Sequence, residues 1–454
     1  MTRFGPDCLG DALAHLRPSD HCWVAYSGGL DSTVLLHAAC SICGRLPGEL
    51  RAIHIDHGLH ADSSLWSAHC ARQCDALGVP LVIRCLRLQP LPGESIEAMA
   101  RQSRYRALAA LLAPGDCVLT AHNQDDQAET LLLALLRGSG VQGLAAMPSE
   151  TVLGQGRLLR PLLDVPRLAL EHYARHQGLS WIEDPSNRAQ RQDRNYLRHR
   201  VVPLLRARWP AVSATLARSA GHCAESARLV EAVASDALAG SAGRCGGTLS
   251  IQALAKLDRG RQRSALRLWL RRRGFAIPQT RHLARILDEL LRARPDADPL
   301  VSWAGCEVRR YRDDLFALPP LPPSPGALAI RWEPDSAFAG LDLPLGLGSL
   351  QWPEMADGRR RDPWSAGALT VRFGLTGQTC RPRLAAHRRA LKKLLQEAGI
   401  PRWLRPYVPL VLSGERLIAV AGVCGCGHEG SGPGPIESPR WRGHPWEELG
   451  VFAC

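Results

Sequence analysis

Lysine is almost absent from this 454-residue chain, although lysine and arginine together number 56. The lysines are Lys256, Lys392 and Lys393, so arginine carries nearly all of the positive charge. A coding bias explains the choice of arginine, but it does not explain the excess of basic residues that leaves a formal net charge of +13. Because surplus positive charge attracts phosphate groups, the composition favours a polyanionic partner, with nucleic acid as the first candidate.

Long apolar runs are also missing, and none approaches the roughly 20 residues needed to cross a bilayer. The segment Met1–Leu9 contains Arg3 and Asp7 and is not followed by an apolar core with a cleavage site, so no secretory leader is predicted. Fifteen cysteines, an odd number spread over a long chain, suit reduced thiols better than a disulfide framework. We therefore expect a cytoplasmic protein without a membrane partner.

The chain is long enough for two or three domains. From residue 22 to about 187, short apolar segments alternate with helix-like stretches, which predicts a doubly wound α/β domain with a parallel sheet over 1–210. The strand candidates are Cys22–Ser27, Leu50–Asp56, Pro80–Leu86, Cys117–Ala121 and Leu179–Ile182. Long segments rich in Ala, Leu and Arg predict a helical domain over 211–318. The proline-rich start of 319–365 predicts a linker, and 366–454 is expected to form a small α+β domain with a mobile tail.

A short loop follows the first strand candidate and directly precedes a helix. Its residues are Ser27, Gly28, Gly29, Leu30, Asp31 and Ser32. At such a junction backbone N–H groups and the helix dipole bind anions, with phosphate as the natural ligand. The glycines permit close approach, the serines add donors, and Asp31 is predicted to hold Mg²⁺ against the phosphates. The loop has no Gly-Lys-Ser/Thr, which excludes the Walker class, and an ordinary strand-to-helix turn is the alternative.

An acidic cluster begins at the end of the strand candidate Cys117–Ala121, where ligands bind in open α/β sheets. The catalytic candidates in it are His122, Asp125, Asp126 and Glu129. The acidic residues recur at spacings of three and four, so we expect one helical face that binds Mg²⁺, positions an ammonium group or accepts a proton. Asp126 is the preferred base or anchor and a second metal ligand, and His122 is expected to orient a phosphate. Helix capping is the alternative for the acidic residues.

Two more segments supply candidates for nucleotide contact. Asp56 and His57 follow the second strand candidate and are predicted to contact the cofactor, with a capping aspartate and a packed histidine as the alternative. Arg101 and Arg104 share a helical face, where they are expected to clamp a phosphate or the base being activated. We assign Arg101 to cofactor binding and Arg104 to catalysis, and a solvated basic face is the competing interpretation.

A run of arginines is predicted to form a basic ridge beside this domain. Its members are Arg188, Arg191, Arg194, Arg198 and Arg200. Arginines at such spacings neutralise phosphates without reading bases, so the ridge is interpreted as a contact for the backbone of a nucleic acid. Solvated surface charge is the alternative.

Together these motifs resemble the PP-loop ATP pyrophosphatases and, within that superfamily, the tRNA(Ile)-lysidine synthetases. The most specific block runs from His122 to Gly140. Further similar segments are His54–Leu59, Glu97–Tyr105, Arg160–Leu163, Asp184–Arg198 and Ala390–Gly422. The resemblance implies that ATP adenylates the C2 oxygen of the wobble cytidine in tRNA(Ile), and that free L-lysine then displaces AMP. It implies ATP and Mg²⁺ as cofactors, Asp126 as anchor or base for lysine, and the basic ridge as a tRNA contact.

Two other functions stay open at this point. A tRNA thiolase of the same fold would use cysteines to carry sulfur or an iron–sulfur cluster, and a non-catalytic RNA-binding protein would bind without consuming ATP. The cysteine pairs Cys40/Cys43 and Cys424/Cys426 are interpreted as structural thiols rather than metal ligands. The sequence leaves the oligomeric state open, a homodimer included.

Overall fold

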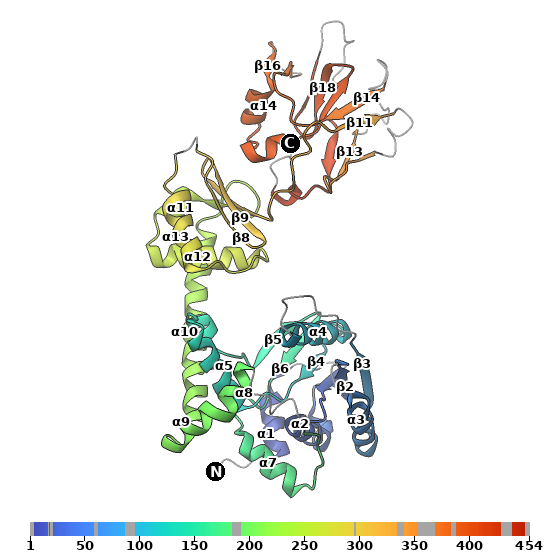
Figure 1. The fold of residues 1–454 in the computed structure, drawn as a ribbon, viewed down its shortest axis with the longest axis vertical. Coiled ribbons are helices and arrows are strands. Elements are labelled where there is room, and N and C mark those ends of the chain that lie inside the picture. Colours follow the sequence, from blue (N-terminus) through green and yellow to red (C-terminus); the bar gives the residue numbers. More distant parts are fainter. Residues whose placement is uncertain are drawn as a thin grey trace. The chain divides into compact units, whose positions relative to one another are not determined.

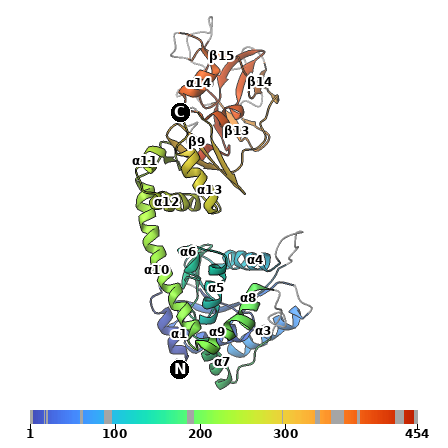
Figure 2. The same ribbon diagram turned by 60° about the vertical axis from the view of Figure 1, so that its left-hand side comes forward.

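The computed structural model describes most of the chain. The described residues are 4–16, 18, 21–58, 62–86, 96–183, 192–294, 297–333, 340–352, 368–382, 387–427 and 438–449. They divide into two compact units, residues 1–229 and 230–454 (Figures 1 and 2). None of the helices in the described ranges has the length and apolarity to cross a membrane.

The first unit is built on a six-stranded sheet. Its strands are β1 (His21–Ala25), β2 (Glu49–Asp56), β3 (Leu81–Cys85), β4 (Cys117–Leu119), β5 (Glu150–Leu153) and β6 (Gly156–Leu159), in the order β3-β2-β1-β4-β6-β5. All neighbouring pairs are parallel except the hairpin of β5 and β6. This arrangement confirms the predicted α/β fold.

Both faces of the sheet are buried, because alternate residues of a strand point to opposite sides. Cys22 and Val24 of β1 join a core whose helices are α1 (Pro6–Leu13), α2 (Leu30–Ser41), α3 (Ser63–Leu77) and α7 (Arg167–His176). Trp23 of the same strand instead packs against α4 (Ile96–Leu111) in a second core. Figure 1 shows these helices in two layers around the sheet, as expected for a parallel sheet.

The strand predicted at Leu179–Ile182 does not form. The place beside β4 is occupied by β6, whose residues Leu158 and Leu159 are buried. The segment instead passes the phosphate loop, where Ile182 N donates to Gly28 O at 2.8 Å. The strand prediction is wrong here, because this four-residue segment with three apolar residues packs beside a loop rather than in the sheet.

The direction of winding reverses between β1 and β4, since the chain goes outward through β2 and β3 and then returns to the other side of β1. Such a switch point opens a crevice at the carboxyl ends of the strands. Two helices begin there, α2 and α5 (Gln124–Leu136). The predicted phosphate loop and acidic cluster therefore meet at one edge of the sheet, as inferred from the sequence.

Helices complete the first unit and lead into the second. They are α6 (Val141–Leu144), α8 (Asp193–Tyr196), the π-helical turn η3 (Leu197–Val201), α9 (Val202–Arg208) and α10 (Val212–Ala239). The turn η3 continues directly from α8, and α8 packs against α5. Side chains of α8 and η3 are thereby brought next to the acidic cluster.

The second unit begins with helices, as predicted for 211–318, but it also contains a sheet. The helices are α11 (Ile251–Ala255), α12 (Arg259–Arg272), α13 (Thr280–Arg285) and the π-helical turn η4 (Ile286–Leu290). The antiparallel sheet has the order β7-β10-β9-β8 and comprises β7 (Leu249–Ser250), β8 (Leu300–Trp303), β9 (Cys306–Tyr311) and β10 (Asp314–Leu318). The alternation of buried Cys306 and Val308 with partly exposed neighbours in β9 is the strand signal that the helical prediction missed.

The linker predicted for 319–365 is wrong for the described residues from 329 onward, because they supply three strands. The C-terminal strands are β11 (Ala329–Trp332), β12 (Leu341–Asp342), β13 (Ser349–Gln351), β14 (Leu369–Arg372), β15 (Thr379–Cys380), β16 (Arg389–Ala390), β17 (Leu410–Ser413), β18 (Arg416–Val420), β19 (Cys424–Gly425) and β20 (Arg440–Arg442). β11 is an edge of the five-stranded sheet β11-β14-β17-β18-β19. Trp332 and Leu350 are fully buried, so these segments contribute to the core rather than connect domains.

The α-helix of this part is α14 (Leu391–Glu397), and 3₁₀ turns lie at η6 (Arg402–Tyr407) and η7 (Glu447–Leu449) in the described residues. A disulfide joins Cys380 to Cys426, so the prediction of reduced thiols is wrong for this pair. The glycine-rich segment predicted to be a mobile tail lies largely outside the described residues.

Candidate active site

The phosphate loop connects β1 to α2 in a conformation that needs glycine at position 28. Gly28 has φ +80°, and a Cβ there would lie 3.0 Å from both Cys70 Sγ and Ile182 Cδ1. The serine hydroxyls bond within the loop, with Ser27 Oγ 2.9 Å from Ser32 Oγ and Ser32 Oγ donating to Gly29 O at 3.0 Å. In the described part of the chain, no side chain caps the N-terminus of α2. The first turn of α2 therefore presents backbone N–H groups to an anion.

A cavity of about 550 Å³ opens beside this loop, within the size range of small-molecule sites. The loop residues that line it are Ser27, Gly29, Leu30, Asp31 and Ser32. An apolar wall is formed by Ile53, Ile55, Tyr105 and Leu108, and the basic lining residues are Arg101, Arg104, Arg167, Arg175 and Arg198. The cavity combines an apolar surface for a base with a strongly positive surface for phosphates.

Asp31 carries a carboxylate that is short of partners. Its Oδ1 atom is enclosed without a hydrogen-bond partner in the described part of the chain, and the nearest cationic nitrogen is Arg167 Nε at 3.9 Å. Burial raises the pKa of Asp31 to about 6, with Arg167 opposing the rise and Asp126 adding to it. An underbonded carboxylate at a phosphate site fits Mg²⁺, which usually takes one or two carboxylates together with substrate phosphates.

Asp126 and Glu129 are held in a four-residue ion network with two arginines from α8 and η3. Asp126 Oδ1 accepts from Arg194 at 3.0 Å and from Arg198 at 2.7 Å. Glu129 accepts from Arg194 Nε at 2.9 Å and from Arg198 Nε at 2.7 Å. The Glu129 side chain is only 3% exposed. The two guanidinium groups therefore offset the desolvation cost of burying two neighbouring carboxylates.

Asp126 also forms the capping box of α5. Its Oδ2 atom accepts from Asn123 N at 3.0 Å, while Asn123 Oδ1 accepts from Asp126 N at 3.1 Å. Burial favours a higher pKa for Asp126, but Arg194, Arg198 and the Asn123 N–H outweigh it and lower the pKa. Both carboxylate oxygens of Asp126 thus accept hydrogen bonds. Asp126 is therefore less suited than Asp31 to the predicted role of metal ligand.

Asp125 points away from the cavity that Asp31 lines. It accepts from Arg167 N at 3.2 Å and from the side chains of Arg206 and Ser213. Its carboxylate lines a second cavity of about 1250 Å³. Asp125 therefore connects the start of α5 to α7, α9 and α10, and its assignment as a catalytic residue stays a prediction that these contacts do not support.

Asp125→Asn is expected to leave the turnover number nearly unchanged and to lower stability by about 1–3 kcal/mol, because bonds to a partly buried carboxylate are weakened. Turnover and the unfolding midpoint should be measured side by side with Asp126→Asn, which is expected to lose activity. Equal losses of activity in the two variants would restore Asp125 as a catalytic residue.

His122 lines the cavity at the end of β4. Its Nδ1 atom lies 3.0 Å from Thr120 Oγ1. Burial lowers the pKa of His122 to about 4; Asp126 opposes this change, and the surrounding arginines add to it. His122 is therefore neutral near pH 7, and it can donate or accept one hydrogen bond without adding charge.

Of the other candidates, Arg101 and Arg104 line the cavity, and His57 contacts Arg104. Arg104 donates to His57 Nε2 from Nε at 3.2 Å, and Arg101 stacks on Tyr105 with its guanidinium carbon 5.1 Å from the ring centroid. Burial and Arg104 lower the pKa of His57 to about 4, which leaves a neutral acceptor for Arg104. Asp56 accepts from Gly58 N at 2.8 Å in the turn after β2 and is not among the residues that line the cavity, so its contact with the cofactor stays a prediction.

The predicted basic ridge is divided by the structure. Arg194 and Arg198 turn inward to the acidic residues of α5, so their charge is largely neutralised within the protein. Arg200 is exposed and can face a nucleic acid. Arg188 and Arg191 lie outside the described residues. The segment therefore does not present all five arginines to phosphates, because Arg194 and Arg198 pair with buried carboxylates.

Helix α7 supplies residues that the sequence analysis missed. Arg167, Glu171 and Arg175 all line the phosphate cavity. Glu171 lies 3.9 Å from Arg167 and 4.0 Å from Arg175. Their spacing of four residues was a readable signal for one helical face, but only the packing of α7 against α2 brings that face to Asp31.

Comparison with known proteins finds similarity over almost the whole chain. The PP-loop domain family matches residues 9–205, the TilS substrate binding domain matches 249–316, and the TilS substrate C-terminal domain matches 369–435. The tRNA(Ile)-lysidine synthase of Coxiella burnetii is 41% identical over 430 residues, which cover 94% of this chain and 95% of that protein. The enzyme of the same name from Methylococcus capsulatus is 44% identical over 91% of this chain and 94% of its own length.

Among solved structures, the U34-tRNA thiolase NcsA from Methanococcus maripaludis with its [4Fe-4S] cluster is similar to part of the chain. It matches with a TM-score of 0.43 and 16% identity over 48% of this chain and 77% of that chain. Similarity at this level does not bear on function.

Proposed function

The chain belongs to the tRNA(Ile)-lysidine synthase family, and we propose that it ligates lysine to C2 of the wobble cytidine of an isoleucine tRNA. The observation that carries this proposal is the cavity shared by the phosphate loop and His122, with the Asp126 network behind it. The chain is an ATP-dependent ligase with a PP-loop domain. The identity of each catalytic residue is part of the proposal.

In the first step we propose that the loop and the N-terminus of α2 bind the triphosphate of ATP, while the arginines lining the cavity neutralise it. The C2 oxygen of the cytidine attacks the α-phosphorus, and the bond to pyrophosphate breaks. Asp31 would hold Mg²⁺, which withdraws charge from the phosphates when it is bound. Arg101 and Arg104 lie where a base entering the cavity is oriented, and His57 positions Arg104.

In the second step the amine of free lysine attacks C2, the bond from C2 to the AMP oxygen breaks, and the proton of the attacking amine passes to solvent. We propose Asp126 as the anchor of the lysine ammonium. Because Arg194 and Arg198 lower the pKa of Asp126, it is better suited to binding a cation than to taking its proton. Such binding requires that one arginine exchange its bond to Asp126 for another partner.

Recognition of tRNA is proposed to involve exposed basic residues, among them Arg200. A phosphate contact of this kind gives affinity rather than base specificity. Free lysine as the acceptor, a cytoplasmic location and a homodimeric state also stay predictions.

The thiolase alternative has no support from the site. No cysteine is among the described residues that line the phosphate cavity. Of the C-x-x-C pair, Cys40 donates to Leu77 O at 3.5 Å and Cys43 is exposed. Sulfur transfer needs a reactive thiolate beside the activated base, and this arrangement does not supply one.

The test is to incubate the purified chain with ATP, labelled lysine and tRNA(Ile) transcripts. We expect lysine incorporation that requires ATP, releases AMP and pyrophosphate in equal amounts, and disappears when the wobble cytidine is replaced by uridine. The uridine transcript is the matched control, because it differs at the reacting base alone. ATP consumption without lysine incorporation, or incorporation independent of the wobble base, would contradict the proposal.

A further inference from the structure

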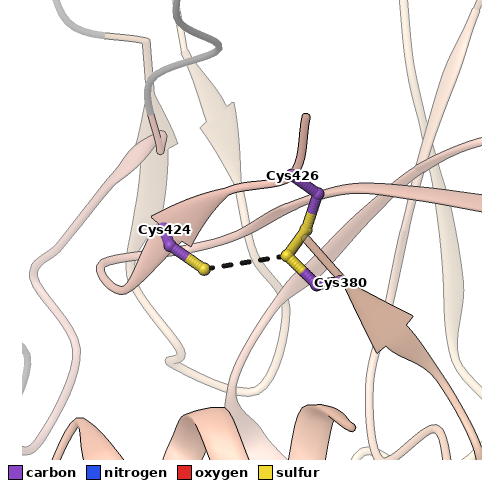
Figure 3. A group of neighbouring side chains, drawn as sticks. All are labelled: Cys380, Cys424 and Cys426. Atoms are coloured by element: carbon purple, nitrogen blue, oxygen red, sulfur yellow. Dashed lines mark hydrogen bonds between the residues drawn. A yellow bond between two sulfur atoms is a disulfide. The ribbon is translucent and has the colours of Figure 1, made fainter. Parts of the chain in front are cut away.

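Three cysteines of the C-terminal part lie together, far along the sequence from the proposed active site. Cys380 is on β15, Cys424 is on β19, and Cys426 is the first residue after β19 (Figure 3). Their Sγ atoms all lie within 4.8 Å of one another. Cys380 and Cys426 are joined as a disulfide, and Cys424 Sγ is 3.9 Å from Cys380 Sγ. We refer to these residues as the three-cysteine cluster.

The local backbone explains why these three sulfurs converge. Cys424 and Cys426 are two residues apart in extended chain, so both side chains point to the same side. β19 pairs with β18, and Cys426 N donates to Ile418 O at 2.8 Å. On the other side, a bridge between Pro382 and Cys426 and a bond from Gly427 N to Arg381 O bring the end of β15 alongside. The positions of the three cysteines are therefore set by backbone pairing as well as by the disulfide.

We propose that the three-cysteine cluster, once reduced, binds one Zn²⁺ ion through its three thiolates. Zinc bonds thiolate sulfur at about 2.3 Å in a tetrahedron, which places neighbouring sulfurs about 3.8 Å apart. The distance of 3.9 Å between the sulfurs of Cys380 and Cys424 already matches such an edge. The bonded sulfurs of Cys380 and Cys426 have to separate, by a change in side-chain torsions on strands that stay paired.

The disulfide and the metal site are two states of the same residues. Reduction of the bond between Cys380 and Cys426 takes two electrons and two protons from a dithiol reductant, which becomes a disulfide itself. Binding of Zn²⁺ then displaces the thiol protons to solvent, because the thiolate is the ligand. Soft sulfur ligands favour zinc over Mg²⁺ or Ca²⁺, so the site would not compete for the Mg²⁺ used with ATP.

The three sulfur ligands differ in their exposure to solvent. Cys380 is 2% exposed, Cys426 is fully buried, and Cys424 is partly exposed. Among the described residues, no further His, Cys, Asp or Glu belongs to the group, so the three thiolates are the ligands named in the proposal. The ion would fasten β15 to the edge strand β19 of the five-stranded sheet.

The test uses the full chain, purified without an affinity tag in the presence of a dithiol reductant and dialysed against metal-free buffer. Elemental analysis is expected to find about one zinc ion per chain. Cobalt added to zinc-depleted protein is expected to give the thiolate charge-transfer band and the intense visible bands of tetrahedral Co²⁺. Cys424→Ser should weaken metal binding at least about tenfold, since even an outer partner of a ligand contributes that much.

Cys245→Ser is the matched control, because Cys245 lies in the same unit and is also partly exposed. It should keep the metal content and the cobalt spectrum of the unmodified chain. Reduced protein that contains no zinc and gives no thiolate–cobalt band overturns the proposal, and so does a cobalt spectrum that Cys424→Ser leaves unchanged. Because the cobalt titration is done on the unmodified chain, the test does not depend on whether the variant folds.

Discussion

Asp31→Asn is expected to abolish lysidine formation and, at the same time, to raise the unfolding midpoint of the ligand-free protein. The loss of activity follows from the position of Asp31 in the phosphate cavity, where its carboxylate is the proposed Mg²⁺ ligand. Removing one preorganised group that stabilises developing charge costs about 10²- to 10³-fold in turnover. Single-turnover formation of the adenylated tRNA measures this step directly.

The gain in stability follows from the raised pKa of Asp31, about 6 in the fold against 3.8 for the ordinary group. Above pH 6 the carboxylate is charged although burial disfavours the charge, so asparagine removes a penalty of up to about 3 kcal/mol. About a quarter of the side chain is exposed, which makes this figure an upper limit. The difference should shrink as the pH falls through 6, because the carboxyl group then takes up a proton in the folded protein.

Calorimetric scans of both proteins between pH 5 and pH 8 measure this effect, with the exposed Asp164 replaced by asparagine as the control. Asp164→Asn is expected to change neither the midpoint nor activity. A ligand-free Asp31→Asn protein that is less stable than the unmodified chain at pH 8 would show that Asp31 has a structural partner. The claim that the buried charge of Asp31 destabilises the ligand-free protein would then be wrong.

Arg198→Ala is expected to have the largest effect on stability of any single substitution at the site. Arg198 forms bonds to both Asp126 and Glu129. Burial tends to lower the pKa of Arg198, but these carboxylates outweigh it and raise the pKa. Breaking a buried ion pair on one side costs about 3–5 kcal/mol, and here two buried carboxylates would be left to share the single positive charge of Arg194. Activity should fall as well, since Arg198 lines the phosphate cavity.

A double-mutant cycle with Glu129→Gln separates the network from other effects of Arg198. If the penalty comes from the uncompensated carboxylate, the double variant is expected to be more stable than Arg198→Ala alone. Unfolding by denaturant gives the four free energies that the cycle needs. Arg208→Ala is the control, because Arg208 is an exposed arginine of the neighbouring helix α9. Strictly additive free energies would mean that the two side chains do not depend on each other.

The sequence predicted the parts of the site that depend on consecutive residues. The phosphate loop could be recognised because a strand, a glycine turn and a helix follow one another within Cys22–Ala39, and backbone geometry alone presents the N–H groups of such a turn. The approach of this loop to His122 could also be inferred, because the carboxyl ends of parallel strands meet at one edge. The structure places both beside one cavity.

The partners of the charged residues could not be predicted in the same way. Spacing suggested that Asp125, Asp126 and Glu129 share a face, but consecutive residues of a helix are turned by about 100°, and Asp125 faces the second cavity. The arginines that neutralise Asp126 lie 68 and 72 residues further along the chain. Their sequence pattern is equally consistent with an exposed ridge, because a guanidinium group binds phosphate and carboxylate alike.

By itself, then, the sequence determined the α/β fold, the phosphate loop and the edge of the sheet where the chemistry takes place, because each depends on local backbone geometry and the period of apolar residues. Only the tertiary structure decided which carboxylates are neutralised and which one, Asp31, is left underbonded. The physical reason is that the pKa of a buried group depends on charges a few ångströms away in space, and those charges come from α7, α8 and η3, which are remote in sequence.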